Sequence, residues 1–77
     1  MASNSAHVVH DGTYDRWNIK LNGSHKDSDR VKSEAVKKAR TILRAAGGGE
    51  LVIHNLDGTI GEKDTVPPGN DPYPPKG

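Results

Sequence analysis

The stretch that most constrains the fold is residues 33–55, where an amphipathic helix pattern runs directly into an apolar strand pattern. The apolar residues recur at the i, i+3, i+4, i+7 spacing that gathers side chains on one helix face; they are Ala35, Val36, Ala39, Ile42, Leu43 and Ala46. Three glycines at 47–49 then end the helix, because glycine adopts a left-handed backbone without steric cost. The following run, 50–54, is too short for a helix and is typical of a strand. Helix followed by strand is the predicted core.

The ends of this unit carry recognisable signals. Asp29 and Ser33 are both suitable N-cap residues, and the pattern does not choose between them. The sequence Asn-Leu-Asp-Gly at 55–58 is a hairpin signal after the apolar run. We therefore expect the predicted strand to turn back on itself, with a last short strand starting near Thr59 and Ile60.

The chain before the helix contains two further strand patterns. Residues 1–6 are small and polar, and we expect a disordered lead. His-Val-Val-His at 7–10 predicts a short strand, and the alternation of apolar and polar residues over 16–21 predicts a half-buried one. We interpret the polar segment 24–29 as a connection to the helix.

Together these elements predict an α+β domain over residues 7–66, a small antiparallel or mixed sheet with one covering helix. The predicted order is β-β-α-β, followed by the short last strand. We expect the helix stripe to pack on the apolar residues of the sheet: Trp17, Ile19, Leu21, Leu51 and Ile53. Residues 67–77 are proline-rich and are predicted to form an extended tail.

The composition of the 77 residues excludes several classes of protein. Cysteine is absent, which excludes disulfides and thiolate metal sites. No apolar run approaches the roughly 18 residues that a membrane-spanning helix needs, and the first residues lack the basic and apolar regions of a signal peptide. We therefore expect a soluble cytoplasmic protein with no membrane contact.

The charge is unevenly distributed along the chain. From residue 30 to residue 46 there are six basic residues against Glu34, a local sum of +5, whereas the remainder sums to −4. The commonest explanation is a solvated helix face, but an anionic partner is the more specific hypothesis. The candidate nucleic-acid contacts are Lys37, Lys38, Arg40 and Arg44. Phosphate contacts would dominate such binding, although an exposed aromatic platform is missing and the net charge is close to zero.

The alternative hypothesis is a protein-interaction module. An exposed sheet edge is one possible contact surface. The other is the proline- and tyrosine-rich tail, whose candidate residues are Pro72, Tyr73, Pro74 and Pro75. We favour a non-catalytic binding module, with nucleic acid slightly ahead of protein as the partner.

No pattern of catalytic or metal-binding residues stands out. His7 and His10 are three residues apart, so an extended strand directs them to opposite faces, and a shared metal would need His54 or a distorted backbone. The three glycines follow a helix, whereas phosphate loops precede one. No serine or histidine has a recognisable nucleophile context. We therefore expect no enzymatic activity, no metal and no cofactor.

Several of these segments resemble a known family. They are the run 48–54 (Gly-Gly-Glu-Leu-Val-Ile-His), Asp57-Gly58 with Ile60, the tail 71–77, the opening His-Val-Val strand and the tryptophan strand. The chain resembles an uncharacterised bacterial family catalogued as domain of unknown function two-one-eight-eight, over nearly all of its length after Ala6. It departs from the family in having Val31 where members often have a hydroxyl helix cap. The resemblance implies a small single domain of bacterial or phage origin, and no established activity.

Overall fold

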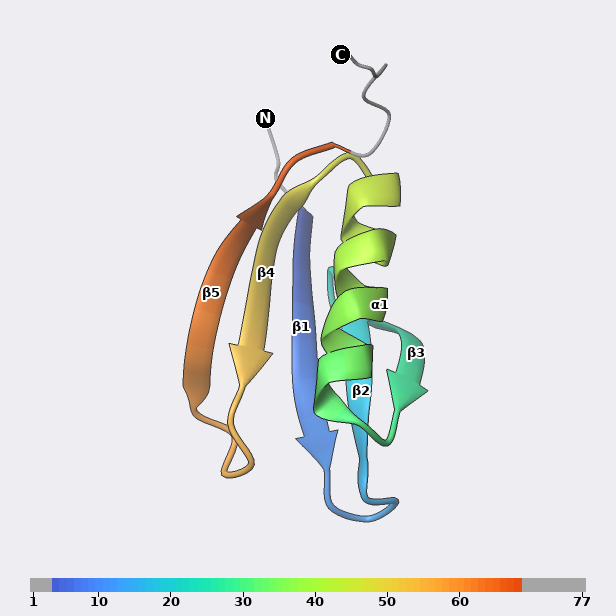
Figure 1. The fold of residues 1–77 in the computed structure, drawn as a ribbon, viewed down its shortest axis with the longest axis vertical. Helices are drawn as coiled ribbons and strands as arrows, with labels where there is room; N and C mark the ends of the chain where they lie inside the picture. Colours follow the sequence, from blue (N-terminus) through green and yellow to red (C-terminus); the bar gives the residue numbers. More distant parts are fainter. Residues whose placement is uncertain (1–3, 69–77) are drawn as a thin grey trace.

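A computed structural model describes residues 4–68, which fold into a sheet of five strands with one helix packed against it (Figure 1). The elements are β1 (Asn4–Asp11), β2 (Arg16–Leu21), β3 (Ser24–Asp29), α1 (Lys32–Ala45), β4 (Gly49–His54) and β5 (Ile60–Val66). The strand order across the sheet is β3-β2-β1-β4-β5. The predicted class, a small α+β domain with one covering helix, is confirmed.

The sheet is mixed because of how α1 connects its two halves. Strands β1, β2 and β3 form an antiparallel meander, and β4 and β5 form an antiparallel hairpin. Strand β4 lies beside β1 and runs parallel to it, with Val8 opposite Ile53. The chain therefore leaves the β3 edge, crosses one face of the sheet through α1, and returns in the middle as β4 (Figure 1). Within residues 4–68, the helix lies on this face of the sheet and no helix lies on the opposite face.

The core lies between α1 and the sheet, largely as the apolar patterns predict. Ala35, Ala39 and Leu43 of the helix are fully buried against apolar residues of the strands. Of the five predicted partners, Trp17, Ile19, Leu51 and Ile53 belong to the buried cluster and Leu21 packs at its margin. The predicted helix stripe needs a correction at three positions, because Val36 and Ile42 are only partly buried and Ala46 is exposed.

Segment 24–29 is a strand, which corrects its interpretation as a connection. It pairs with β2, with Trp17 opposite Asp29 and Leu21 opposite Ser24, and a bulge interrupts the ladder between Ile19 and Lys20. The segment contains no apolar residue, so side-chain periodicity could not predict it. It is held by backbone pairing at the edge of the sheet.

The start of β1 corrects the predicted disordered lead. The strand begins at Asn4, and Ala6 is fully buried, so residues 4–6 belong to the domain, while residues 1–3 lie outside the described part. The Asn4 side-chain amide donates to the carbonyl oxygens of Ala46 (2.8 Å) and Gly48 (3.0 Å). Carbonyl groups at a helix C-terminus lack partners within the helix. Asn4 satisfies two carbonyls at this end of α1 and thereby ties the first strand to the helix.

Both ends of α1 follow from the local sequence. Gly47 and Gly48 have φ of 109° and 83°, and their N–H groups donate to Arg44 O (3.1 Å) and Leu43 O (2.8 Å), the pattern of a Schellman motif. The glycine stop is therefore confirmed. At the other end the N-cap is Val31, without a side-chain cap, so neither predicted candidate holds that position. Asp29 instead accepts a hydrogen bond from the Val31 N–H (2.9 Å).

Over the part of the chain that the structure describes, no helix is long and apolar enough to cross a membrane.

Candidate functional site

The four basic residues singled out on the helix occupy three different positions around α1. Lys37 and Arg44 lie on the side opposite the buried stripe and are exposed. Lys38 lies on the flank next to β3, and Arg40 lies on the flank next to β5, as their ion-pair partners show. These four residues are close in sequence, but the fold places them on three different sides of the helix.

Lys38 binds the β3 edge of the sheet. Its ammonium group lies 3.1 Å from Asp29 Oδ2 and 3.9 Å from Asp27 Oδ2, and it donates to the Ser28 carbonyl (3.2 Å). The hydrogen bond to Asp29, reinforced by the charge of Asp27, raises the pKa of Lys38. The Val31 N–H and then Lys38 lower the pKa of Asp29. Lys38 thus links the helix to a strand that contains no apolar residue.

Arg40 has the equivalent role at the other edge. Its Nη1 donates to Asp64 Oδ2 of β5 at 2.9 Å. Both side chains are about half exposed, and an ion pair of this kind contributes roughly 0–1 kcal/mol. When Asp27, Asp29 and Asp64 are counted with the helix, the local excess of five positive charges falls to two.

Lys37 and Arg44 are the cations on the outer side of α1. Lys37 lies 3.6 Å from Glu34, one turn earlier, in a pair whose members are both largely exposed. Arg44 lies seven residues after Lys37, which places it about 10 Å further along the helix axis. The candidate tail contact, residues 72–75, lies outside the described residues.

The open face of the sheet brings together two histidines that are 47 residues apart. His7 Nδ1 of β1 and His54 Nε2 of β4 are separated by 2.9 Å. His54 Nδ1 lies 3.0 Å from the Gly58 carbonyl oxygen, and Ser5 Oγ lies 3.1 Å from His7 Nε2. These contacts connect Ser5, His7, His54 and the β4–β5 turn in one row.

The hydrogen-bond partners fix the tautomers of both rings. A carbonyl oxygen only accepts, so His54 carries its proton on Nδ1 and presents a lone pair on Nε2. His7 then donates from Nδ1 to His54 and accepts at Nε2 from the Ser5 hydroxyl. Burial, followed by the neighbouring His54, lowers the pKa of His7; Glu50 opposes the shift and Lys20 adds to it. The lowered pKa favours the neutral form of the His7 ring, which is the form that donates from Nδ1 to His54 and accepts from Ser5.

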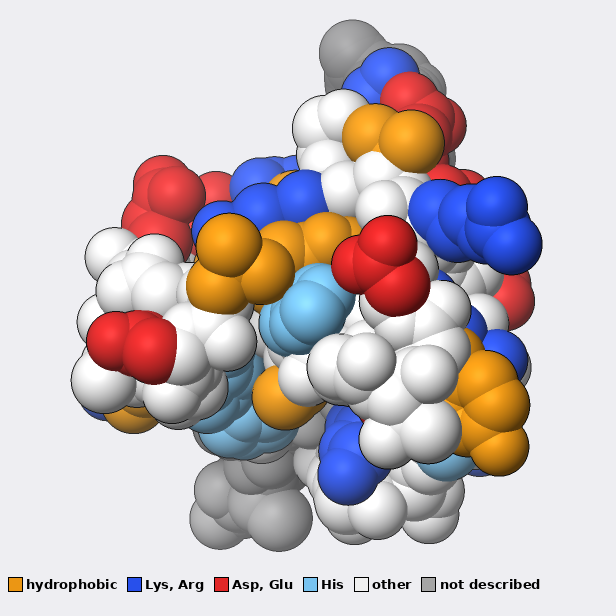
Figure 2. Space-filling view, turned by 90° about the horizontal axis from the view of Figure 1, so that it is seen from below, with side chains coloured by type: hydrophobic (Ala, Val, Ile, Leu, Met, Phe, Trp, Pro, Cys, Tyr) orange, Lys and Arg blue, Asp and Glu red, His pale blue; other side chains and the backbone are white. Residues whose placement is uncertain are grey.

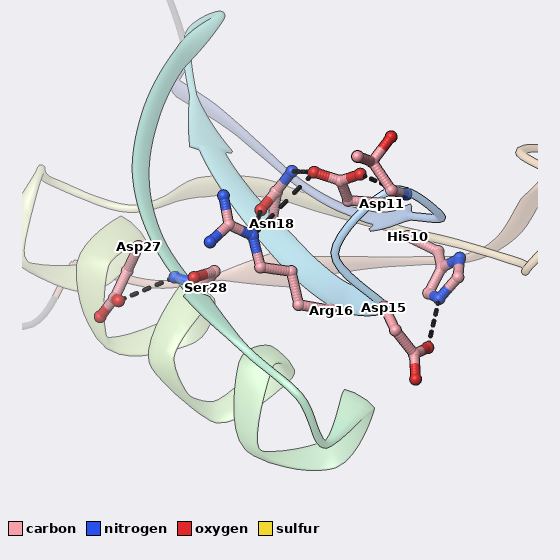
Figure 3. A network of polar contacts seen from close by, with 8 residues as sticks. His10, Asp11, Asp15, Arg16, Asn18, Asp27 and Ser28 are labelled. Carbon is pink, nitrogen blue, oxygen red and sulfur yellow. Dashed lines mark hydrogen bonds and ion pairs between the residues drawn. The ribbon is translucent and has the colours of Figure 1, made fainter.

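His10 lies apart from this pair, as the predicted alternation of the strand requires. Its ring stands edge-on to Trp17, with centroids 5.0 Å apart, and its Nε2 is 3.4 Å from Asp15 (Figure 3). Within residues 4–68, no group of three or more histidine or carboxylate side chains is placed to hold a metal ion.

A second polar network closes the β1–β2 turn (Figure 3). Arg16 Nε donates to Asn18 Oδ1 (3.2 Å), and Asn18 Nδ2 donates to Asp11 Oδ2 (3.2 Å). The Arg16 guanidinium also lies over the Tyr14 ring, 4.7 Å from its centroid. The Asn18 hydrogen bond, partly offset by desolvation, lowers the pKa of Asp11. A shallow cavity of about 510 Å³ borders this network and is lined by Tyr14, Arg16, Ser28, Asp29 and Arg30.

Sequence reasoning missed two of these features. The His7–His54 contact depends on β4 pairing with β1, and no local pattern reports which strands become neighbours. The ion pairs of Lys38 and Arg40 depend on β3 and β5 flanking the sheet. The available signal was the charge pattern. Segments 24–29 and 62–64 carry carboxylates, and the helix between them carries the excess of cations with which carboxylates can pair.

The fold and its surfaces define a small two-layer α+β domain with one face of the sheet open. Over residues 6–66 the chain matches the family described as an uncharacterized protein conserved in bacteria (DUF2188). Because this match covers most of the chain, the protein belongs to that family. Neither a curated protein nor a solved structure gave a match.

Proposed function

We propose that this protein is a non-catalytic binding module that contacts nucleic-acid phosphates through the outer side of α1. The observation that carries the proposal is the placement of Lys37 and Arg44 on the solvent side of the helix, about 10 Å apart along its axis. Neither side chain is used to hold α1 on the sheet. Exposed cations on a rigid element are the groups that neutralise phosphates.

Lys38 and Arg40 take a secondary part in this proposal. Their pairs with the edge strands lie at the surface, and exposed ion pairs cost little to open. Either residue can exchange its carboxylate for a phosphate, but in doing so it loses a closer ion pair than Lys37, whose pair with Glu34 is 3.6 Å long and largely exposed. We therefore expect contact with about two to four phosphates, which gives a log-affinity against log-salt slope of about −2 to −4 on duplex DNA.

The surroundings of Ser5 support a module without hydrolytic activity. Ser5 and His7 have the contact of a nucleophile with its base. An acyl-transfer site also needs N–H donors free to stabilise an oxyanion. The Ser5 N–H already donates to Asn22 Oδ1 at 2.9 Å. Ser5, His7 and His54 also lie on the face of the sheet opposite α1.

The test is fluorescence anisotropy on labelled duplex DNA and RNA at about 50 mM salt, where phosphate contacts are strong. Replacing both outer cations (Lys37→Gln with Arg44→Gln) should flatten the salt slope by about 2 and weaken binding similarly for all sequences. The matched control removes two cations from the sheet, one from β2 and one from β5 (Lys20→Gln with Lys63→Gln), and should bind like the unchanged protein. Equal weakening by both pairs, or no binding at 50 mM salt, would refute the proposal.

A protein partner at the β5 edge is the second candidate, because one observation favours it. Residues 60–65 of this edge strand are exposed. A groove of about 450 Å³ runs beside it, lined by Lys32, Ser33, Val36, Arg40, Ile53 and Glu62. An extended segment added to this edge would gain backbone hydrogen bonds and side-chain contacts in the groove.

Salt and truncation distinguish the protein-partner hypotheses from nucleic-acid binding. Strand addition at β5 should be nearly insensitive to salt, should protect the β5 amides from hydrogen exchange, and should survive loss of Lys37 and Arg44. If the tail is the contact instead, deleting residues 71–77 should abolish binding in a variant that remains folded.

A further inference from the structure

The β1–β2 turn carries an exposed aromatic ring that the proposed function does not use. Tyr14 belongs to this turn and is 64% exposed. The Arg16 guanidinium lies over its ring, 4.7 Å from the centroid, in a cation–π contact. This contact covers one face of the ring, and the exposure of the residue leaves the other face open to solvent. The sequence-based expectation that an exposed aromatic platform is missing is therefore corrected at Tyr14.

The guanidinium beneath the ring is held in place by the polar network of the turn. Arg16 Nε donates to Asn18 Oδ1 (3.2 Å) and lies 4.0 Å from Asp11 Oδ2 (Figure 3). Asn18 donates to the same Asp11 oxygen (3.2 Å), and the other Asp11 oxygen accepts from the Thr13 N–H (3.0 Å). A ligand that stacks on Tyr14 therefore has few side chains left to immobilise, which lowers the entropy cost of binding.

The shallow cavity beside the ring supplies polar groups for the rest of a ligand. Its volume of about 510 Å³ lies within the roughly 300–1,000 Å³ of small-molecule sites. Its lining residues are Tyr14, Arg16, Ser28, Asp29 and Arg30. Among residues 4–68, no carboxylate lies within ion-pair distance of Arg30. Asp29, the acidic group of the lining, is already bound to Lys38 (3.1 Å) and to the Val31 N–H (2.9 Å). Arg30 is therefore the cation that this cavity offers to an anion.

An exposed ring next to an arginine matches the chemistry of an unpaired nucleotide. Bases of any sequence stack on aromatic side chains, and a guanidinium binds phosphate through paired hydrogen bonds. A base within a duplex has to be unstacked before a side chain can stack on it. We propose that this cavity binds one nucleotide of a single-stranded nucleic acid, with the base on the open face of Tyr14 and the phosphate on Arg30. The inference rests on the proposed function in taking nucleic acid as the ligand, but it uses a surface other than the outer side of α1.

The test is fluorescence anisotropy of the full chain with a labelled thymidine oligomer of about 12 nucleotides at about 50 mM salt. Tyr14→Ala should weaken binding by about fivefold or more, as expected for the loss of one base–aromatic stack. Tyr14→Phe keeps the ring and should bind like the unchanged protein. Arg30→Gln should flatten the log-affinity against log-salt slope by about 0.7, the value for one phosphate of a single strand.

The other tyrosine of the chain supplies the matched control, because Tyr73→Ala removes an equal side chain from the tail and should bind like the unchanged protein. Unaltered binding in Tyr14→Ala, or equal losses in Tyr14→Ala and Tyr14→Phe, would overturn the site. Thymidine monophosphate should displace the oligomer only at far higher concentration, since it lacks the neighbouring phosphates of a strand. Equal displacement would overturn the assignment to a strand and give the cavity to a nucleotide in solution.

One measurement needs no variant. In nuclear magnetic resonance spectra of the unchanged protein, the ring protons of Tyr14 should move upfield as the oligomer binds, because the ring current of a stacked base shields them. The Tyr73 ring protons should stay in place. Unmoved Tyr14 signals at saturating oligomer would contradict the proposal.

Duplex DNA separates this inference from the proposed function. Binding to a duplex should not depend on Tyr14, because its bases are already stacked. If Tyr14→Ala loses single-strand binding while Lys37→Gln with Arg44→Gln keeps full affinity for both ligands, the proposed function fails and the cavity stands. If the double variant loses duplex binding while Tyr14→Ala binds single strands normally, the cavity fails and the proposed function stands.

Discussion

Gly48 shows how strongly one position can be determined by the contact between two layers. It has φ of 83°, and its N–H closes the helix end on Leu43 O. A Cβ at this position would lie 2.6 Å from the Val66 carbonyl oxygen and 2.8 Å from the Pro68 nitrogen. Both obstacles are backbone atoms, which cannot move aside as a side chain can. The position therefore requires glycine for its conformation and for its surroundings.

We expect Gly48→Ala to destabilise the protein by roughly 1–3 kcal/mol, because the change combines left-handed strain with backbone overlap. Gly12→Ala is the matched control, since nothing lies within 4 Å of its added methyl group, and it should leave stability nearly unchanged. Urea unfolding followed by tryptophan fluorescence gives both values. Similar midpoints for the two variants would show that the end of α1 is assigned incorrectly.

Helix α1 has a buried side, two flanks and an outer side, and their surroundings differ. One side buries Ala35, Ala39 and Leu43 in the core. The two flanks bind the edge strands through Lys38 and Arg40. The outer side is left to solvent. Because the edge strands bury so little, the flanking ion pairs help determine where β3 and β5 lie relative to the helix.

The buried side provides a direct test of how α1 packs. Leu43 is fully buried whereas Ile42 is only partly buried, so Leu43 should contribute more to stability although both residues belong to the predicted stripe. Leu43→Ala should cost about 2–5 kcal/mol, and Ile42→Ala about 1–2 kcal/mol because less of its side chain leaves water on folding. Thermal and urea unfolding of both variants give the order. A larger loss in Ile42→Ala would mean that the helix is rotated about its axis.

The elements differed in how far the sequence could predict them. Helix α1 was predictable because its periodicity is carried by residues close in sequence, and β2 because its two faces differ in polarity. Strand β3 was not, since both of its faces are polar and only its backbone pairs with β2. Asn4 likewise looked like part of a polar lead, although from the start of β1 it caps the C-terminal end of the helix.

For the whole molecule, charge is better balanced in space than along the chain. Viewed from the end with the β1–β2 and β4–β5 turns, acidic, basic, histidine and apolar side chains are interspersed (Figure 2). The basic run of the helix is flanked by acidic residues from both edges. Candidate cations for phosphate binding could be named from the sequence, but strand order decides which of them are already paired with carboxylates. Strand order also decides that His7 and His54 lie side by side.

The central claim is that the outer side of α1 is the binding surface, and amide chemical-shift mapping during titration with a short DNA duplex tests it most directly. At low salt we predict shifts concentrated in residues 33–44, largest around Lys37 and Arg44, with few changes in β2 and β5. Raising the salt concentration should reverse them, because the contacts are to phosphates. Shifts concentrated in β5, on the open face of the sheet, or nowhere would contradict the claim.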